Sequence, residues 1–126
     1  MKIINIAKLD GHEVIVLTGR PNNVRKIAKH LEAVLYLLPS NEDYFEDYPT
    51  IVNGLQENLT YYENRIVVIT TQSEEFLDCL LQSNLDFVQV TVRKYDHDDA
   101  DTYRIRVLTK EEAWANRCAF KFELRK

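Results

Sequence analysis

The chain has 126 residues, of which 45% are hydrophobic and 29% are charged. This length and balance predict one folded domain spanning residues 1–126 and exclude a disordered chain. A net charge of −4 argues against a nucleic-acid binder that is held mainly by phosphate contacts.

Residues 2–19 predict an N-terminal β-hairpin. Two runs of strand-forming residues flank Asp10-Gly11, a dipeptide that tolerates the positive φ angles of a tight turn. The second run, residues 14–17, is continuously apolar and therefore predicts a buried central strand.

The stretch TGRPNNVRKI, residues 18–27, leads from this strand into a predicted helix over residues 24–38. Apolar residues recur there at helical spacing, basic residues fall on the opposite face, and Pro39 ends the helix. Taken alone, the stretch predicts a strand-to-helix turn with Asn22 or Asn23 as the N-cap.

The middle of the chain predicts a loop, a helix and a strand in succession. Residues 39–50 are polar and acidic, which favours a loop, and residues 51–64 predict a weaker helix around Gly54. Residues 65–71 are apolar without alternation, which predicts a second buried strand.

A helix and a half-exposed strand follow. The helix over residues 71–83 opens on Thr71 and Glu74, which have the spacing of a capping box. Residues 86–95 alternate between apolar and polar side chains, as a strand with one exposed face does. The apolar face of this strand carries Val88, Val90 and Val92, and the polar face carries Gln89, Thr91 and Arg93.

The C-terminal part predicts an antiparallel pair of strands and a short helix. Residues 96–101 turn the chain, and residues 102–108 return as the partner strand. Thr109 and Glu112 have a second capping-box spacing, which opens a helix over residues 110–118.

These elements together predict the fold class. The chain ends on residues 120–125 as a strand or extended tail. Strand–helix–strand passages with buried strands predict an α/β protein with a compact mixed sheet. The sheet would contain the N-terminal β-hairpin, a P-loop-like strand-loop-helix and the C-terminal antiparallel hairpin plus short helix.

Three runs, taken in order, carry a resemblance to a known family. They are VIVLTGRPNNVRKIAKHLEAVLYLL at residues 14–38, IVVITTQSEEFLDCL at residues 66–80, and LTKEEA at residues 108–113. Their order resembles ATP-binding-cassette ATPases of the SMC and OLD-nuclease type, P-loop proteins of bacterial and phage origin. In that family the phosphate loop has the form GPNNxGKS, so the resemblance implies a degenerate, shortened ATPase-like domain.

The departures from the family fall on its chemistry. With the loops aligned on Lys26, Arg25 replaces a loop glycine and Ile27 replaces the hydroxyl residue that binds magnesium. Arg20 replaces the first loop glycine, with Gly19 displaced by one position. Glycines let backbone N–H groups wrap the phosphates, and an isoleucine cannot bind magnesium.

Further departures lie downstream of the loop. Gln72 replaces the family's switch histidine, and only Glu46 and Asp47 resemble its acidic pair. About 20 residues separate the loop helix from the NGL stretch at residues 53–55, too few for the family's helical insert. The resemblance therefore implies a protein that does not hydrolyse ATP.

We expect a catalytically inactive protein that acts by protein binding, as a regulatory subunit or mimic of a larger SMC/OLD-type ATPase in phage defence or counter-defence. The alternative is a sensor that binds a nucleotide or phosphate without hydrolysis at Asn22, Asn23 and Lys26, with ATP as its candidate ligand. A third hypothesis is an unusual enzyme with relocated catalytic groups, which would depend on Lys26 and Asp47. A homodimer is a further option for the assembly.

Four tyrosines surround the acidic loop and are candidates for an interface. Tyrosine combines a large apolar ring with a polar tip and is enriched where proteins meet. The same residues could pack the loop against its own domain. They are Tyr44, Tyr48, Tyr61 and Tyr62.

No metal site is expected. Residues 96–101, DHDDAD, suggest a calcium loop, but their spacing does not fit one. Ala100 falls at the third ligand position, Asp101 at the glycine position and Val107 at the position of the bidentate glutamate. The three histidines are scattered and predict surface residues.

The compartment is expected to be the cytosol. Cys79 and Cys118 are too few for a disulfide framework or a structural zinc site, so we expect reduced thiols. No signal peptide is visible, and no apolar run approaches the roughly 20 residues that span a membrane.

Overall fold

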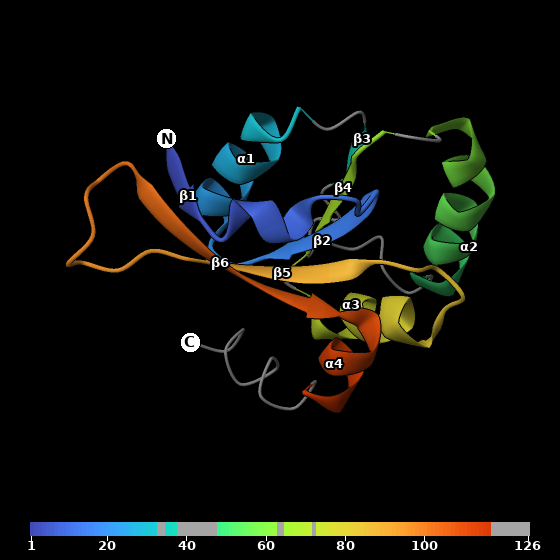
Figure 1. The fold of residues 1–126 in the computed structure, drawn as a ribbon. Helices are drawn as coiled ribbons and strands as arrows, with labels where there is room; N and C mark the ends of the chain where they lie inside the picture. The colour runs from blue at the N-terminus through green and yellow to red at the C-terminus, as the bar shows by residue number, and fades with distance from the viewer. Residues whose placement is uncertain (33–34, 38–47, 63–64, 72, 117–126) are drawn as a thin grey trace.

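The computed structural model describes residues 1–32, 35–37, 48–62, 65–71 and 73–116. Its centre is a six-stranded mixed sheet with the order β1-β6-β5-β2-β4-β3 (Figure 1). The strands are β1 (Lys2–Ile4), β2 (Val14–Thr18), β3 (Leu35–Leu37), β4 (Val67–Thr70), β5 (Val88–Arg93) and β6 (Thr102–Thr109). The α-helices are α1 (Pro21–His30), α2 (Tyr48–Asn58), α3 (Glu74–Gln82) and α4 (Lys110–Ala115), and the short 3₁₀ helices are η1 (Ile6–Leu9) and η3 (Leu59–Tyr62).

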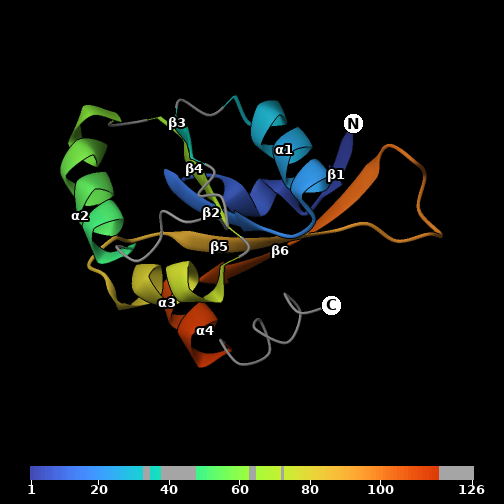
Figure 2. The same ribbon diagram turned by 180° about the vertical axis from the view of Figure 1, so that it is seen from behind.

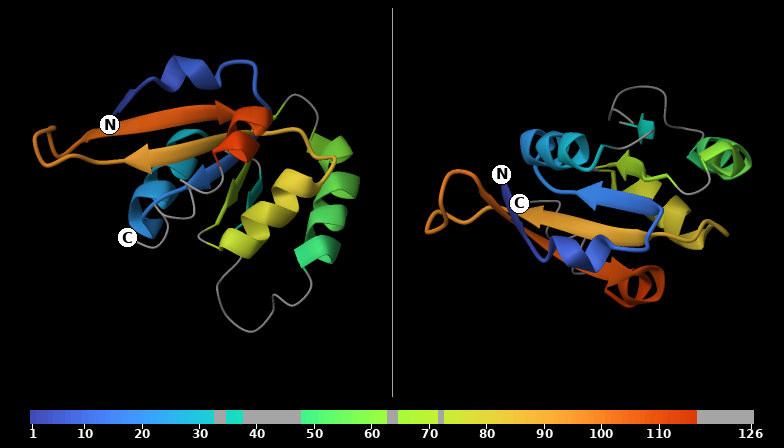
Figure 3. Two further views of the ribbon diagram at one scale, coloured as in Figure 1. Left: turned by 90° about the horizontal axis from the view of Figure 1, so that it is seen from below. Right: turned by 45° about the horizontal axis from the view of Figure 1, so that its top comes forward.

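Helices cover both faces of the sheet, so the protein has three layers (Figures 2 and 3). On one face α1 and η1 pack on the sheet through a cluster that includes Leu9, Val24 and Ile27. On the other face α2, α3 and α4 pack through a cluster that includes Val52, Phe76 and Ala113. This arrangement confirms the predicted α/β fold with a mixed sheet.

Most of the predicted strands are confirmed. β2 and β4 are parallel neighbours at the centre of the sheet, and the described part of each is almost fully buried, as their continuous apolar runs predict. β5 and β6 form the predicted antiparallel pair. Thr109 and Glu112 form a complete capping box, with bonds in both directions, at the start of α4.

The predicted N-terminal hairpin is wrong, because β1 pairs with β6 in parallel and not with β2. After β1, Asn5 adopts a left-handed conformation with φ of 74° and the chain enters η1. Asp10 and Gly11 do form a turn, but it follows η1. Ile3 and Leu9 are buried on the α1 face, and this burial outweighs the local preference for a hairpin.

The helix predicted over residues 24–38 is also wrong in its second half. α1 begins earlier, at Pro21, and ends at His30, and Glu32 then takes a positive φ of 54°. Residues 35–37 form β3, which pairs in parallel with β4 at the edge of the sheet. The spacing of a short apolar run is compatible with a helix or with a strand. Here the pairing with β4 makes residues 35–37 a strand.

Two helix starts differ in detail from the prediction. α2 begins at Tyr48 and not at residue 51. α3 is capped by Ser73, whose Oγ accepts a hydrogen bond from the Phe76 N–H at 3.2 Å, so the capping box predicted from Thr71 and Glu74 is wrong. The Thr71 hydroxyl accepts the Ser73 N–H at 2.9 Å and orients the turn before the cap.

Gln89 is predicted on an exposed strand face but is only 1% exposed. It lies in register between Val16 of β2 and Leu108 of β6, on the face that α2, α3 and α4 cover. Among the described residues, neither polar atom of its amide group has a hydrogen-bond partner. A buried polar group without a partner costs about 1–3 kcal/mol of stability.

Replacing Gln89 with methionine should therefore stabilise the protein. Methionine has a similar length and no polar group to desolvate, so we expect Gln89→Met to raise the free energy of unfolding by about 1 kcal/mol. Urea unfolding measures this change. Gln82→Met, at an exposed position of α3, is the matched control and should stay within about 0.5 kcal/mol of the parent. A less stable Gln89→Met protein contradicts the account.

Candidate functional site

A cleft of about 1120 Å³ opens where β2 and β5 end and α1 begins. One wall is the start of α1, residues 20–23, and the other is the end of β5 with the connection to β6, residues 92–96. Ligands of α/β proteins bind at the carboxyl ends of the parallel strands. This cleft is therefore the candidate functional site.

The connection from β2 to α1 is very short and consists of Gly19 and Arg20. Gly19 has a φ of 141°, and a Cβ atom placed on it would lie 2.9 Å from the carbonyl oxygen of Val92 in β5. Just before it, the Thr18 hydroxyl donates a hydrogen bond to the Val90 carbonyl at 3.2 Å. The turn thus lies directly against the backbone of β5, and only glycine fits there.

This geometry places the residues of the expected phosphate loop in a helix. Pro21 occupies the first helical position, where the fixed φ of proline matches that of a helix. Arg20 is the N-cap residue, and its side chain makes no capping hydrogen bond. The N-cap predicted at Asn22 or Asn23 is therefore wrong, because both lie in the first turn of α1. Ile27, at the position of the magnesium-binding hydroxyl residue, is completely buried against the sheet. Its side chain therefore does not line the cleft, as a magnesium ligand would have to.

The expected nucleotide residues are only partly brought together. Asn22 and Asn23 line the cleft, and their backbone N–H groups lie in the first turn, which has no intrahelical acceptors. Lys26 is exposed one turn further along and does not line the cleft. Gln72, Glu46 and Asp47 lie outside the described residues.

The expected interface tyrosines are also separated. Tyr48 is buried, its hydroxyl lies 3.0 Å from the Ser73 Oγ, and its ring meets the ring of Phe76 edge to face at 5.2 Å. This position is that of a core residue. Tyr61 is 83% exposed, whereas Tyr44 and the side chain of Tyr62 lie outside the described part of the chain.

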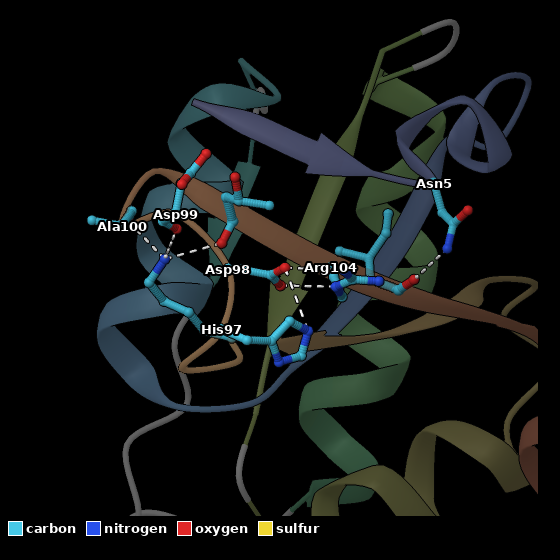
Figure 4. Close-up of polar contacts among 9 residues, drawn as sticks. Asn5, His97, Asp98, Asp99, Ala100 and Arg104 are labelled. Atoms are coloured by element: carbon cyan, nitrogen blue, oxygen red, sulfur yellow. Dashed lines mark hydrogen bonds and ion pairs between the residues drawn. The ribbon is translucent and has the colours of Figure 1, made fainter.

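The β5–β6 connection, residues 94–101, is held together by its own polar groups (Figure 4). The ammonium group of Lys94 donates to the carbonyl oxygens of Asp99, Ala100 and Thr102, at 3.3, 2.6 and 3.0 Å. It therefore closes the loop from inside, so its charge is already compensated by backbone dipoles.

A second set of contacts fixes the same connection. The guanidinium group of Arg104 donates two hydrogen bonds to the carboxylate of Asp98, at 2.8 and 3.0 Å. These bonds, and then the charge of Arg104, hold the pKa of Asp98 below its ordinary value. His97 lies 3.7 Å from the same carboxylate, and its ring stacks on Tyr95. Asp98 is therefore ionised and paired throughout the neutral range.

The charged side chains and N–H groups at the cleft are better suited to binding an anion than to catalysing a reaction. Arg20 is exposed at the start of α1, beside N–H groups on which the helix dipole places positive charge. Asp96 is the exposed carboxylate on the opposite wall. Across the described ranges, no three histidine, cysteine or acidic side chains are placed to hold a metal ion.

Comparison with known proteins gives no match to any family, curated protein or solved structure. The resemblance to SMC/OLD-type ATPases therefore stays a prediction from the sequence. Of the helices that the structure describes, none combines the length and apolar character needed to cross a membrane.

The sequence does not reveal the β5 side of the cleft. Arg93, Tyr95 and Asp96 reach it only because β5 lies next to β2, although Thr18 and Val90, which are hydrogen-bonded across these strands, are 72 positions apart in the sequence. The available signal is the alternating strand that ends at Arg93, followed by an aspartate-rich turn. That signal predicts the hairpin of β5 and β6, but it does not predict that β5 lies next to β2.

Gly19→Ala should destabilise the protein strongly. The new methyl group would meet the Val92 carbonyl at 2.9 Å and force a φ that alanine avoids, at a cost of roughly 2–3 kcal/mol. Gly54→Ala is the matched control, because Gly54 lies inside α2 with open space around its Cβ position. The control should gain up to about 1 kcal/mol in urea unfolding. Equal effects of the two changes would refute the close approach.

Proposed function

We propose that this chain is a catalytically inactive ATPase-like protein of the cytosol that acts by binding a protein partner. The partner would be a larger ATPase of the SMC/OLD type, regulated or mimicked by this chain in phage defence or counter-defence. The observation that carries the proposal is the connection between β2 and α1, where Gly19 and Arg20 alone separate strand from helix.

Two features support the absence of hydrolysis. A phosphate loop needs a run of backbone N–H groups that wraps the phosphates, and a two-residue connection provides no such loop. The position of the magnesium hydroxyl is taken by Ile27, which is needed in the core. Without magnesium, the charge that develops during phosphoryl transfer lacks its main stabilising group.

We expect the purified chain to release no phosphate from ATP with magnesium above the background of buffer alone. We also expect it to co-elute in size-exclusion chromatography with a full-length SMC/OLD-type ATPase encoded in the same genome. An unrelated ATPase of similar size is the control for non-specific binding. Sustained phosphate release that is lost in Lys26→Ala, or elution apart from every such ATPase, contradicts the proposal.

A second function is favoured by the cleft itself. The first turn of α1 contains no acidic residue, and Arg20 adds a positive charge where the helix dipole already attracts anions. This arrangement supports the binding of a phosphate group, free or on a nucleotide such as ATP, without turnover. Such binding would use the backbone of Asn22 and Asn23 and the side chain of Arg20.

The two basic residues Arg20 and Lys26 should then behave differently. Arg20→Ala removes a charge from the cleft wall, whereas Lys26→Ala removes one outside it. We expect ATP, ADP or inorganic phosphate to raise the melting temperature of the parent and of Lys26→Ala, and to raise that of Arg20→Ala much less. No shift in the parent, or dependence on Lys26 alone, removes this second function.

A further inference from the structure

The exposed side of α1 is strongly basic, although the whole chain has a net charge of −4. Val24, Ile27 and Ala28 face the sheet. The opposite side of the helix presents exposed basic side chains. We call this set the α1 basic face: Arg25, Lys26, Lys29 and His30.

Within the described ranges, no ion pair compensates this face. In the described ranges, no carboxylate lies within salt-bridge distance of Arg25, Lys26 or Lys29. Lys26 contributes slightly to lowering the pKa of Asp101, which is lowered mainly by its bond to the N-terminal ammonium group. Among the described residues, the positive charge of the face is therefore largely uncompensated.

The charges of α1 also oppose the stability of the helix. Arg25 and Lys29 are four residues apart, a spacing at which like charges repel. Arg20 at the N-cap adds positive charge at the positive end of the helix dipole. By contrast, α3 begins with Glu74 and Glu75, the arrangement that the dipole favours. The charges of α1 therefore do not stabilise the helix itself.

We propose that the α1 basic face is the surface on which an acidic segment of the partner protein docks. α1 has ten residues and is about 15 Å long, so it matches a short segment with a few carboxylates. Carboxylates form charge-assisted hydrogen bonds with arginine and lysine side chains. All four side chains of the face are exposed in the structure.

An acidic protein segment fits this face better than a nucleic acid does. A long polyanion that follows α1 would meet the exposed carboxylates of Asp96, Asp99 and Asp101 beyond the start of the helix. Among the exposed aromatic rings that the structure describes, Tyr95 lines the cleft beside the start of α1, and it already contacts His97 and Arg104, so it is not free to stack on bases.

The test uses a fluorescein-labelled oligoglutamate peptide and fluorescence anisotropy. We expect the parent to bind the peptide at low salt, with affinity that falls as the ionic strength rises. Arg25→Glu/Lys29→Glu should weaken binding at least about tenfold. Arg65→Glu/Arg106→Glu makes the same change of charge at exposed positions away from α1 and should keep most of the affinity.

Three results would overturn the proposal. They are no binding of the peptide by the parent, equal loss in the two double variants, and tighter binding of labelled oligo-dT than of oligoglutamate. Circular dichroism at the assay temperature must show that both double variants are folded. Because the face is argued to serve the proposed protein partner, the same variants are also tested with the candidate ATPase.

That comparison separates the two proposals. If the ATPase binds the parent and Arg25→Glu/Lys29→Glu equally well, the α1 basic face is not the docking surface and the proposed function stands. If the peptide binds through α1 and the ATPase does not bind at all, the partner is wrong and the acidic-segment site stands. Loss of ATPase binding only in the α1 variant supports both.

Discussion

The close approach of Gly19 to the Val92 carbonyl determines how the two halves of the fold meet. It brings the end of β2 against the end of β5 and starts α1 immediately afterwards. The same short turn buries Ile27 and turns Asn22 and Asn23 into helical residues. A wrapped phosphate loop and this turn exclude each other, because both need the same few residues. The proposed absence of hydrolysis therefore rests on backbone geometry as well as on the changed side chains.

The charged groups of the β5–β6 connection and those of α1 differ in how far they are compensated. In the β5–β6 connection the charged groups mostly compensate each other, through Lys94 and the backbone carbonyls and through Asp98 and Arg104. On α1 they do not, since Arg25 and Lys29 have no partner among the described residues. The connection is therefore fixed by its own contacts, whereas α1 carries exposed positive charge. Binding, whether of a phosphate group or of a carboxylate-rich segment, is the activity that this division favours.

Local sequence signals predict the parts of the fold that depend on local chemistry. The apolar runs of β2 and β4 and the capping box at Thr109 describe burial or hydrogen bonds within a few residues. The errors arise where distant pairing decides. β1 takes β6 and not β2 as its partner, and residues 35–37 leave a helical pattern to pair with β4. The same limit applies to the cleft: Asn22 can be predicted there, but the wall from β5 cannot.

The central claim is that the turn at Gly19 leaves no phosphate loop, and an NMR titration tests it most directly. Amide ¹H–¹⁵N spectra of the labelled protein are recorded with increasing ATP, with and without magnesium. The account predicts that any shifts are confined to the two cleft walls, residues 20–23 and 92–96, and that they do not depend on magnesium. Magnesium-dependent shifts centred on Lys26 and Ile27 would contradict it.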